Sequence, residues 1–328
     1  MNNEVVLGVD GGKSKTVALL ATHTGMVIGK GRAGSSDKYD VPLQQAVKAI
    51  SVAVEEAGRE AGVTWPVKIG CFGLAGADWP EDIVDLEREL RARGFAEQVV
   101  VKNDMSIALQ ANANWGVVVS AGTHTAAAIR LPDGSEWHSG WFAFEGPGGV
   151  TAGHRVLWAV LKAYDGRGEP TALTELVLEA TGHTDELALL RALSQGKFDD
   201  ANQAALAPLL FEAHYQHGDR VAAEIIVDLG VEIASWATGL LSRFDLQTMD
   251  APVILTGGMF KGEGSLLLDT VTMSVHMRAP RAELKRAKRE PVIGALLYAI
   301  KQAGWSVTPE VTEQIEHTGP GSDFYRTR

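Results

Sequence analysis

Two short segments place small, hydroxyl-bearing and charged residues at a turn between two apolar runs. The first reads VVLGVDGGKSKTVALL over residues 5–20, and the second reads VVVSAGTHTAAAIR over residues 117–130. Glycine lets backbone N–H groups approach an anion closely, and a small hydroxyl adds one further donor to a phosphate oxygen. The pair therefore predicts two phosphate-binding hairpins in two related half-domains, both directed at one cleft.

The candidate phosphate ligands are the small and basic residues of the two turns. They are Gly11, Gly12, Lys13, Ser14 and Thr16 in the first turn, and Gly122, Thr123 and Thr125 in the second. Asp10 cannot bind a phosphate itself, so a carboxylate at this place implies a bridging Mg²⁺ with its waters. For either segment taken alone, the alternative is an ordinary hairpin with a loose glycine-rich turn. Finding the pair favours phosphate binding.

Length, charge and cysteine content exclude several classes of protein. A chain of 328 residues with 45% apolar content favours two domains. A formal net charge of -11 argues against a nucleic-acid partner, because duplex binding requires clustered Lys and Arg. The apolar stretches are shorter than a membrane span and no leader is evident, so we expect a soluble, cytoplasmic protein without a membrane partner. Cys71 is the only cysteine, which excludes internal disulfides and cysteine-based metal centres.

The elements that must carry these residues alternate in the α/β manner along the first half. Helical spacing, start and stop signals and apolar runs define them. After the opening hairpin we expect a loop over 31–40, a helix over 47–57, a strand over 67–74, a helix from Pro80 to Gly94, a strand over 99–102 and a helix over 105–113. Functional residues lie at the carboxyl ends of strands in such sheets. This rule draws attention to Asp10, Gly76 and Asp104.

The second half begins with the repeated hairpin and continues through a glycine-dense segment, 140–153, into a mainly helical region that ends at Phe244. A strand over 252–255 then opens onto Gly257 and Gly258, a junction able to admit a nucleotide. A closing helix follows over 291–302. Beyond Trp305 the chain is polar and is predicted to be a loosely held tail. The predicted domains are therefore 1–115, 116–305 with a helical insertion, and the tail 306–328.

The order of these junctions resembles the superfamily of sugar kinases, heat-shock ATPases and actin. Within it, the chain is most similar to the N-acetylglucosamine kinase-like group, which belongs with the BadF/BadG/BcrA/BcrD ATPases. The resemblance runs from about Val5 to Ile300 and rests on GVDGGKSKT, GLAGAD, the pair Asn103–Asp104, LTGGMF and PVIGALLYAI. It implies two RNase H-like (actin-like ATPase) domains around an interdomain cleft. It also implies an ATP-dependent kinase, often dimeric, that phosphorylates a hydroxyl of an amino sugar such as N-acetylglucosamine or glucosamine.

The resemblance assigns a role to each matching position. Asp104 becomes the general base that accepts the proton of the attacking sugar hydroxyl, and Asp10 holds Mg²⁺ through water. Gly257 and Gly258 pack beside the adenosine. The sugar side of the site comprises Asp104 together with Ser36, Asp37, Gly140, Trp141 and Glu145. Without the resemblance, Asp104 is equally well explained as a helix N-cap.

Several positions depart from the pattern of this group. Lys13 stands in a turn that is usually all glycine, where it either clamps a phosphate or points to solvent. His124 occupies a glycine position, where its ring crowds a triphosphate. The segment 146–149 reads GPGG where amino-sugar kinases carry two acids, and Glu145 is the nearest replacement. These changes motivate one alternative, a catalytically degenerate sugar or nucleotide sensor of the same fold.

Two other nucleotide-dependent classes fit poorly. A P-loop would require a glycine where the chain has Leu7. An ATPase that activates a redox enzyme would require cysteines to hold a cluster, and Cys71 alone supplies too few thiolates.

Overall fold

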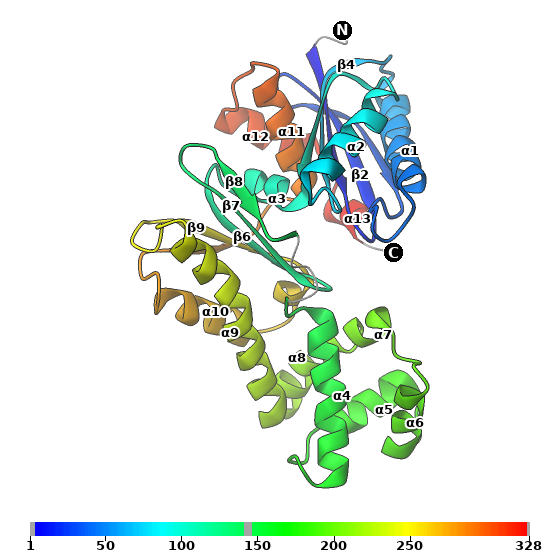
Figure 1. The fold of residues 1–328 in the computed structure, drawn as a ribbon, viewed down its shortest axis with the longest axis vertical. Helices are drawn as coiled ribbons and strands as arrows, with labels where there is room; N and C mark the ends of the chain where they lie inside the picture. The colour runs from blue at the N-terminus through cyan, green and yellow to red at the C-terminus, as the bar shows by residue number, and fades with distance from the viewer. Residues whose placement is uncertain (1–3, 141–145, 327–328) are drawn as a thin grey trace. The chain divides into compact units, whose positions relative to one another are not determined.

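The structure is a computed structural model that describes residues 4–140 and 146–326 (Figure 1). It is an α/β fold with two five-stranded sheets, as predicted. The strands are β1 Val5–Gly11, β2 Thr16–Thr22, β3 Val27–Ala33, β4 Val67–Leu74, β5 Ala96–Asn103, β6 Gly116–Ala121, β7 Thr125–Arg130, β8 Glu136–His138, β9 Pro252–Thr256 and β10 Glu283–Arg286. The helices are α1 Leu43–Ala61, α2 Pro80–Arg91, α3 Asp104–Asn112, α4 Gly149–Asp165, α5 Leu173–Thr181, α6 Glu186–Ser194, α7 Asp200–Ala204, α8 Ala207–His217, α9 Arg220–Arg243, α10 Leu266–His276, α11 Pro291–Gln302, α12 Pro309–Thr318 and α13 Ser322–Tyr325, with a 3₁₀ turn η3 at Gly258–Lys261.

The two sheets have the same strand order. The first runs β3-β2-β1-β4-β5, and the second, taken in the same sense, runs β8-β7-β6-β9-β10. In the first sheet β1, β4 and β5 are parallel, and β2 is antiparallel to β1 and β3. In the second, β6, β9 and β10 are parallel, and β7 and β8 are antiparallel. The duplication predicted from the two glycine turns therefore extends to whole sheets, which is the arrangement of two RNase H-like domains.

Contacts divide the chain into two compact units. Unit 1 comprises Met1–Gly116, Ala128–Trp141 and Ala287–Arg328, and unit 2 comprises Val117–Ala127 and Phe142–Arg286. This division differs from the predicted one, because the closing helix α11 belongs with the N-terminal sheet. Gly8 of β1 makes this packing possible: a Cβ there would lie 2.7 Å from the backbone nitrogen of Leu296 in α11.

Unit 1 is a sheet covered by helices on both faces. Alternate residues of β1 point to opposite sides, as the two-residue period of a strand requires. Leu7 and Val9 pack with α1 and α2, whereas Val6 packs with α3 and α11. The α1 and α2 side and the α11 and α12 side are both visible around β2 and β4 in Figure 1. The carboxyl ends of β1, β4 and β5 lie side by side at one edge of this sheet.

The segment predicted as a loose tail is helical and packs in the core of unit 1. Ile315 of α12 is fully buried and Tyr325 of α13 is 8% exposed, in the cluster that also contains Val6 and Leu296. The Arg32 guanidinium donates to the carbonyl oxygen of Phe324 at 3.0 Å. The prediction of a loosely held tail was therefore wrong, because a few apolar residues on short helices anchor this polar segment in the core.

Unit 2 carries β6 and β9 of the second sheet and most of the helices. Helices α9 and α10 pack against each other, and Gly230 of α9 allows the approach, since a Cβ there would lie 2.8 Å from Thr270. Helix α9 is long and apolar enough to span a membrane by length and composition, with a mean hydropathy of 1.4, which departs from the expectation that all apolar stretches are shorter than a span. Half of that stretch is buried inside the protein, as in the core helix of a soluble domain.

Candidate functional site

The carboxyl ends of three parallel strands lie in one row in unit 1. The strand register places Gly11 beside Leu74, and Leu74 beside Asn103. Neighbouring strands are roughly 4.8 Å apart, so the ends of β1 and β5 lie about 10 Å from each other. Asp10 and Asp104, one residue to either side of this row, thus belong to the same edge of the sheet. This row confirms the expectation that the strand ends gather the polar residues of the first half.

The first glycine turn is closed by backbone hydrogen bonds. The Gly12 N–H donates to the Lys15 carbonyl at 2.9 Å, and the Ser36 N–H donates to the Gly12 carbonyl at 3.1 Å. A Cβ on Gly11 would lie 2.4 Å from Ser36 Oγ and 2.6 Å from Leu74. Any larger residue at position 11 would therefore have to displace these two side chains.

Thr16, a predicted phosphate ligand, and Ser36, a predicted sugar-site residue, bond to each other inside unit 1. Thr16 Oγ1 lies 2.8 Å from Ser36 Oγ and 2.8 Å from the Gly34 carbonyl oxygen. Both hydroxyl-bearing residues are buried, with 0% of Thr16 and 1% of Ser36 exposed. Their observed contacts brace the turn against the 34–36 segment, and direct bonds to phosphate or sugar stay predictions.

The two lysines of the first turn already have partners. Lys13 Nζ lies 3.1 Å from an Asp40 carboxylate oxygen, and its side chain is 53% exposed. Lys15 Nζ donates to the backbone carbonyl of Tyr325 in α13. Ser14, between them, is exposed. From the sequence, Lys13 was predicted either to clamp a phosphate or to point to solvent. In the structure it is exposed and forms an ion pair with Asp40.

Asp10 and Asp104 are carboxyl groups with strongly raised pKa values. Burial raises the pKa of Asp10 to about 7; Lys15 opposes this shift and Glu290 adds to it. The pKa of Asp104 is also raised to about 7, mainly by burial and in addition by the negative charges of Asp10, Asp78 and Asp37. A group with such a pKa is near half ionised at neutral pH, the range in which a general base is most effective.

Asp104 is the first residue of α3, and its neighbour caps that helix. Asn103 Oδ1 accepts the Met105 N–H at 3.0 Å, while Asn103 Nδ2 donates to Asp78 Oδ1 at 2.9 Å. The sequence interpretation of Asp104 as a possible N-cap is thus corrected by one residue, because Asn103 occupies the cap. The sequence did not place Asp78 among the site residues, although its position just beyond the glycine after β4 was a usable signal.

The loop that carries Asp37 is tied to the start of α2. Lys38 forms an ion pair with Asp82, and the Tyr39 hydroxyl donates to the same carboxylate at 2.8 Å. Asp82 also accepts the Trp79 N–H at 2.9 Å. Burial opposes ionisation of Asp82, but these hydrogen bonds outweigh it and hold its pKa below the usual value. Asp82 thereby positions the predicted sugar loop, a role the sequence did not reveal.

Gly140, a predicted sugar-site residue, lies against Asp78 in unit 1. A Cβ at position 140 would be 2.1 Å from Asp78 Oδ1, so a side chain there would displace the carboxylate. Burial raises the pKa of Asp78 itself to about 6, and Asp37 and Asp82 add to the shift. Trp141 and Glu145, the remaining predicted sugar-site residues, lie outside the described residues.

The second glycine turn lies in unit 2 and is braced by the segment at the start of α4. The Thr125 hydroxyl donates to the Pro147 carbonyl, and the Gly149 N–H donates to the Gly122 carbonyl at 2.8 Å. A Cβ on Gly148 would lie 2.5 Å from the Thr123 carbonyl oxygen. Glycine at position 148 therefore allows this close approach. Thr125 is buried, whereas Thr123 is exposed.

Three further positions singled out in the sequence, one within this turn and two after β9, also belong to unit 2. His124 Nε2 lies 3.9 Å from the Asp200 carboxylate. Gly257 follows β9 with φ of 101°, and a Cβ there would lie 2.4 Å from the Ala121 carbonyl oxygen. Gly258 has open space around it. The predicted adenosine glycines are thus adjacent to the end of β6, where the second turn begins.

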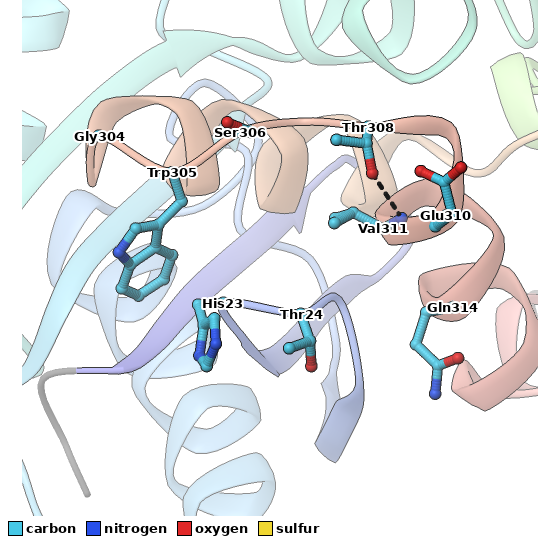
Figure 2. Close-up of a pocket in the computed structure, with 9 residues that line it drawn as sticks. All are labelled: His23, Thr24, Gly304, Trp305, Ser306, Thr308, Glu310, Val311 and Gln314. Atoms are coloured by element: carbon cyan, nitrogen blue, oxygen red, sulfur yellow. Dashed lines mark hydrogen bonds between the residues drawn. The ribbon is translucent and has the colours of Figure 1, made fainter.

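Unit 1 also has a groove that lies apart from the residues described above. It has a volume of about 650 Å³ and is formed by the turn after β2 and the segment that leads into α12. Figure 2 shows His23 and Trp305 on one side and Glu310 and Gln314 on the other. Because no predicted site residue lines it, this groove is not the candidate active site.

The comparisons with known proteins agree over nearly the whole chain. The N-acetyl-D-glucosamine kinase of Dictyostelium discoideum is 27% identical over 320 residues, which cover 92% of this chain and 99% of the relative. The N-acetylmuramic acid/N-acetylglucosamine kinase of Clostridium acetobutylicum is 26% identical over 306 residues, with 90% and 97% covered. Residues 7–299 match the family described as BadF/BadG/BcrA/BcrD ATPases.

A solved structure shows the same fold. A candidate N-acetylglucosamine kinase from Chromobacterium violaceum superposes with a TM-score of 0.70 and 24% identity, and the alignment covers 90% of this chain and 99% of that one. The duplicated sheets and the helices around them therefore occur together in a protein of nearly the same extent.

Proposed function

The chain belongs to the BadF/BadG/BcrA/BcrD ATPase family, and from this premise we propose that it is a sugar kinase. It transfers the γ-phosphoryl group of ATP to a hydroxyl of an amino sugar such as N-acetylglucosamine or glucosamine. The observation that carries this proposal is the half-buried Asp104 carboxyl, with its pKa raised to about 7, at the strand edge that also bears Asp10. Alignment of more than nine-tenths of the Dictyostelium kinase with this chain supports the choice of substrate.

In the proposed reaction Asp104 accepts the proton of the attacking hydroxyl. The sugar oxygen forms a bond to the γ-phosphorus as the bond from that phosphorus to the β,γ-bridging oxygen breaks, and ADP leaves with the electron pair. A positioned base contributes about 10²- to 10⁴-fold to such a step. The remaining acceleration comes from placing the phosphates and the hydroxyl in line. Asp37 and Gly140 belong to the proposed sugar side.

The two glycine turns would hold the phosphates. In the first turn these are the residues Gly11, Gly12, Lys13, Ser14 and Thr16, and in the second Gly122, Thr123 and Thr125. Gly257 and Gly258 would pack beside the adenosine. Glycine at these positions leaves backbone N–H groups accessible to an anion.

Mg²⁺ is the proposed metal, with Asp10 holding it through water. When bound, it would neutralise charge on the phosphates. Among the described residues no group of three His, Cys, Asp or Glu side chains could hold a metal. A single carboxylate such as Asp10 still fits an ion bound mostly by substrate phosphates and water. We also propose a cytoplasmic homodimer, which light scattering of the purified protein would test.

The deciding experiment measures ADP release with Mg²⁺, ATP and a panel of hexoses, amino sugars and N-acetylated sugars. We expect turnover with an amino sugar and a loss of at least about 10²-fold in Asp104→Asn. Asp228→Asn, on the exposed side of α9, is the matched control and keeps the wild-type rate. Binding of ATP without turnover of any sugar would contradict the kinase proposal and favour a sensor.

A further inference from the structure

Asp78 lies at the start of a chain of contacts that ends at the proposed base. Its Oδ1 accepts the Asn103 Nδ2–H at 2.9 Å, and Asn103 Oδ1 accepts the Met105 N–H at 3.0 Å. Asn103 is 4% exposed, so its amide has little access to water. Asp104 lies between Asn103 and Met105 in the chain, in the first turn of α3.

The carboxylate of Asp78 determines which way the Asn103 amide faces. An ionised carboxylate only accepts hydrogen bonds, so it pairs with the NH₂ side of an amide and turns the amide oxygen towards α3. That oxygen is the one that caps the helix. Without the carboxylate, the opposite orientation would place two donors against the Met105 N–H and leave the cap unmade.

The surroundings of Asp78 leave its carboxylate little freedom. A Cβ on Gly140 would be 2.1 Å from Asp78 Oδ1, so the backbone of the 138–140 segment lies directly against it. On the other side, Asp78 directly precedes the cap residue of α2, Trp79. Because the Asp78 carboxylate is held in place, it can fix the orientation of the buried Asn103 amide.

We propose that Asp78 is a positioning residue for the phosphoryl transfer: through the Asn103 amide it fixes the first turn of α3 and with it the direction of the Asp104 carboxylate. This inference rests on the proposed function, because it assigns Asp78 a role in that reaction. Asp78 does not itself exchange a proton with the substrate.

Charge gives Asp78 a second, separable effect on Asp104. The groups that face Asp104 are Asp10, Asp37 and Asp78, all negative when ionised, and each raises its pKa. Asp78 in turn faces Asp37, Asp82 and Lys38. Removing the charge of Asp78 therefore lowers the pKa of Asp104 and keeps the base ionised at lower pH.

Two substitutions separate the hydrogen bond from the charge. Asp78→Asn loses the charge but keeps an oxygen that can accept from Asn103, whereas Asp78→Ala loses both. We expect kcat of Asp78→Ala to fall by about 10- to 100-fold with little change in the KM for ATP, because a small misplacement of a reacting group has effects of this size. Asp78→Asn should restore most of kcat. In both variants the acidic limb of the rate profile should move to lower pH.

The control is Asp228→Asn, and melting temperatures show whether each variant is folded. Wild-type kcat in Asp78→Ala, or an equal loss in Asp78→Asn and Asp78→Ala, would overturn the proposal. If the wild-type protein phosphorylates no sugar, the proposed function fails, but the contact chain is still testable. In protein labelled with ¹⁵N at Met and Asn, the Met105 and Asn103 amide signals should then shift in Asp78→Ala and stay nearly unchanged in Asp78→Asn.

Discussion

The two glycine turns are braced in the same way but differ in charge. In each, the threonine that opens the following strand is buried and lies within hydrogen-bond distance of a backbone carbonyl of a neighbouring segment: Thr16 next to Gly34, Thr125 next to Pro147. The first turn adds Asp10 at its entrance, where the repeated segment has Ala121. The buried threonine that braces the turn is thus present in both copies, whereas the carboxylate belongs to one copy only.

Packing around the two turns differs as well. A Cβ on Gly11 would collide with Ser36 and Leu74, whereas the nearest atom to a Cβ on Gly122 would be 3.9 Å away. In the second turn the close approaches occur at Gly146 and Gly148 of the bracing segment instead. In the second turn, close packing therefore favours glycine in the bracing segment, whereas in the first it favours glycine in the turn itself.

The largest expected effect concerns the carboxylate that only the first turn has. Asp10→Asn should lower sugar-dependent ADP release by at least about 10²-fold, since charge stabilisation by a metal is worth several kcal/mol. Titration of the rate with Mg²⁺ should also show a weaker dependence on the ion. An unchanged Mg²⁺ dependence would show that the first turn does not differ from the second in metal binding.

The next effect compares one glycine from each turn. Gly11→Ala should lower the free energy of unfolding by about 1 to 3 kcal/mol, because an added methyl group must displace packed neighbours. Gly122→Ala has space for the methyl group and should stay within about 0.5 kcal/mol of wild type. Urea unfolding of the two variants checks this prediction. Equal losses would mean that the turns do not differ in packing.

The smallest effect concerns Lys13, whose ammonium group is paired with the Asp40 carboxylate. Lys13→Gln should raise the KM for ATP by about two- to fivefold, because an exposed lysine paired at 3.1 Å contributes at most about 1 kcal/mol. The matched change in the second turn, His124→Gln, should leave the KM for ATP nearly unchanged. A rise above tenfold in Lys13→Gln would show that Lys13 leaves Asp40 and clamps a phosphate.

Elements with a clear hydrophobic period were predicted well. The strand Val67–Leu74 and the helix Pro291–Gln302 have the predicted limits, and α2 begins at Pro80 as expected. Such elements depend on local signals, which a single sequence contains.

Strand β3 was missed because its glycines argue against a strand. Segment 27–33 contains Gly29 and Gly31, where a Cβ would lie 2.2 and 1.9 Å from the carbonyl oxygens of Ala57 and Ala53 in α1. The glycines thus permit α1 to lie directly on the strand, and this packing outweighs their low strand propensity. The helices of segment 309–325 were missed for a related reason, since Ile315 and Tyr325 provide their main anchors in the core.

The sequence by itself determined the chemistry of this protein: two glycine turns, a carboxylate beside the first, a second carboxylate after a strand, and the order of elements that repeats them. Only the tertiary structure decided how these groups are supported. The strand register places Gly11, Leu74 and Asn103 in one row, and hydrogen bonds across the fold join Asn103 to Asp78 and Thr16 to Ser36. These partners are 20 or more residues apart in the chain. No local period encodes such a pairing, because it arises only when separate strands come into register.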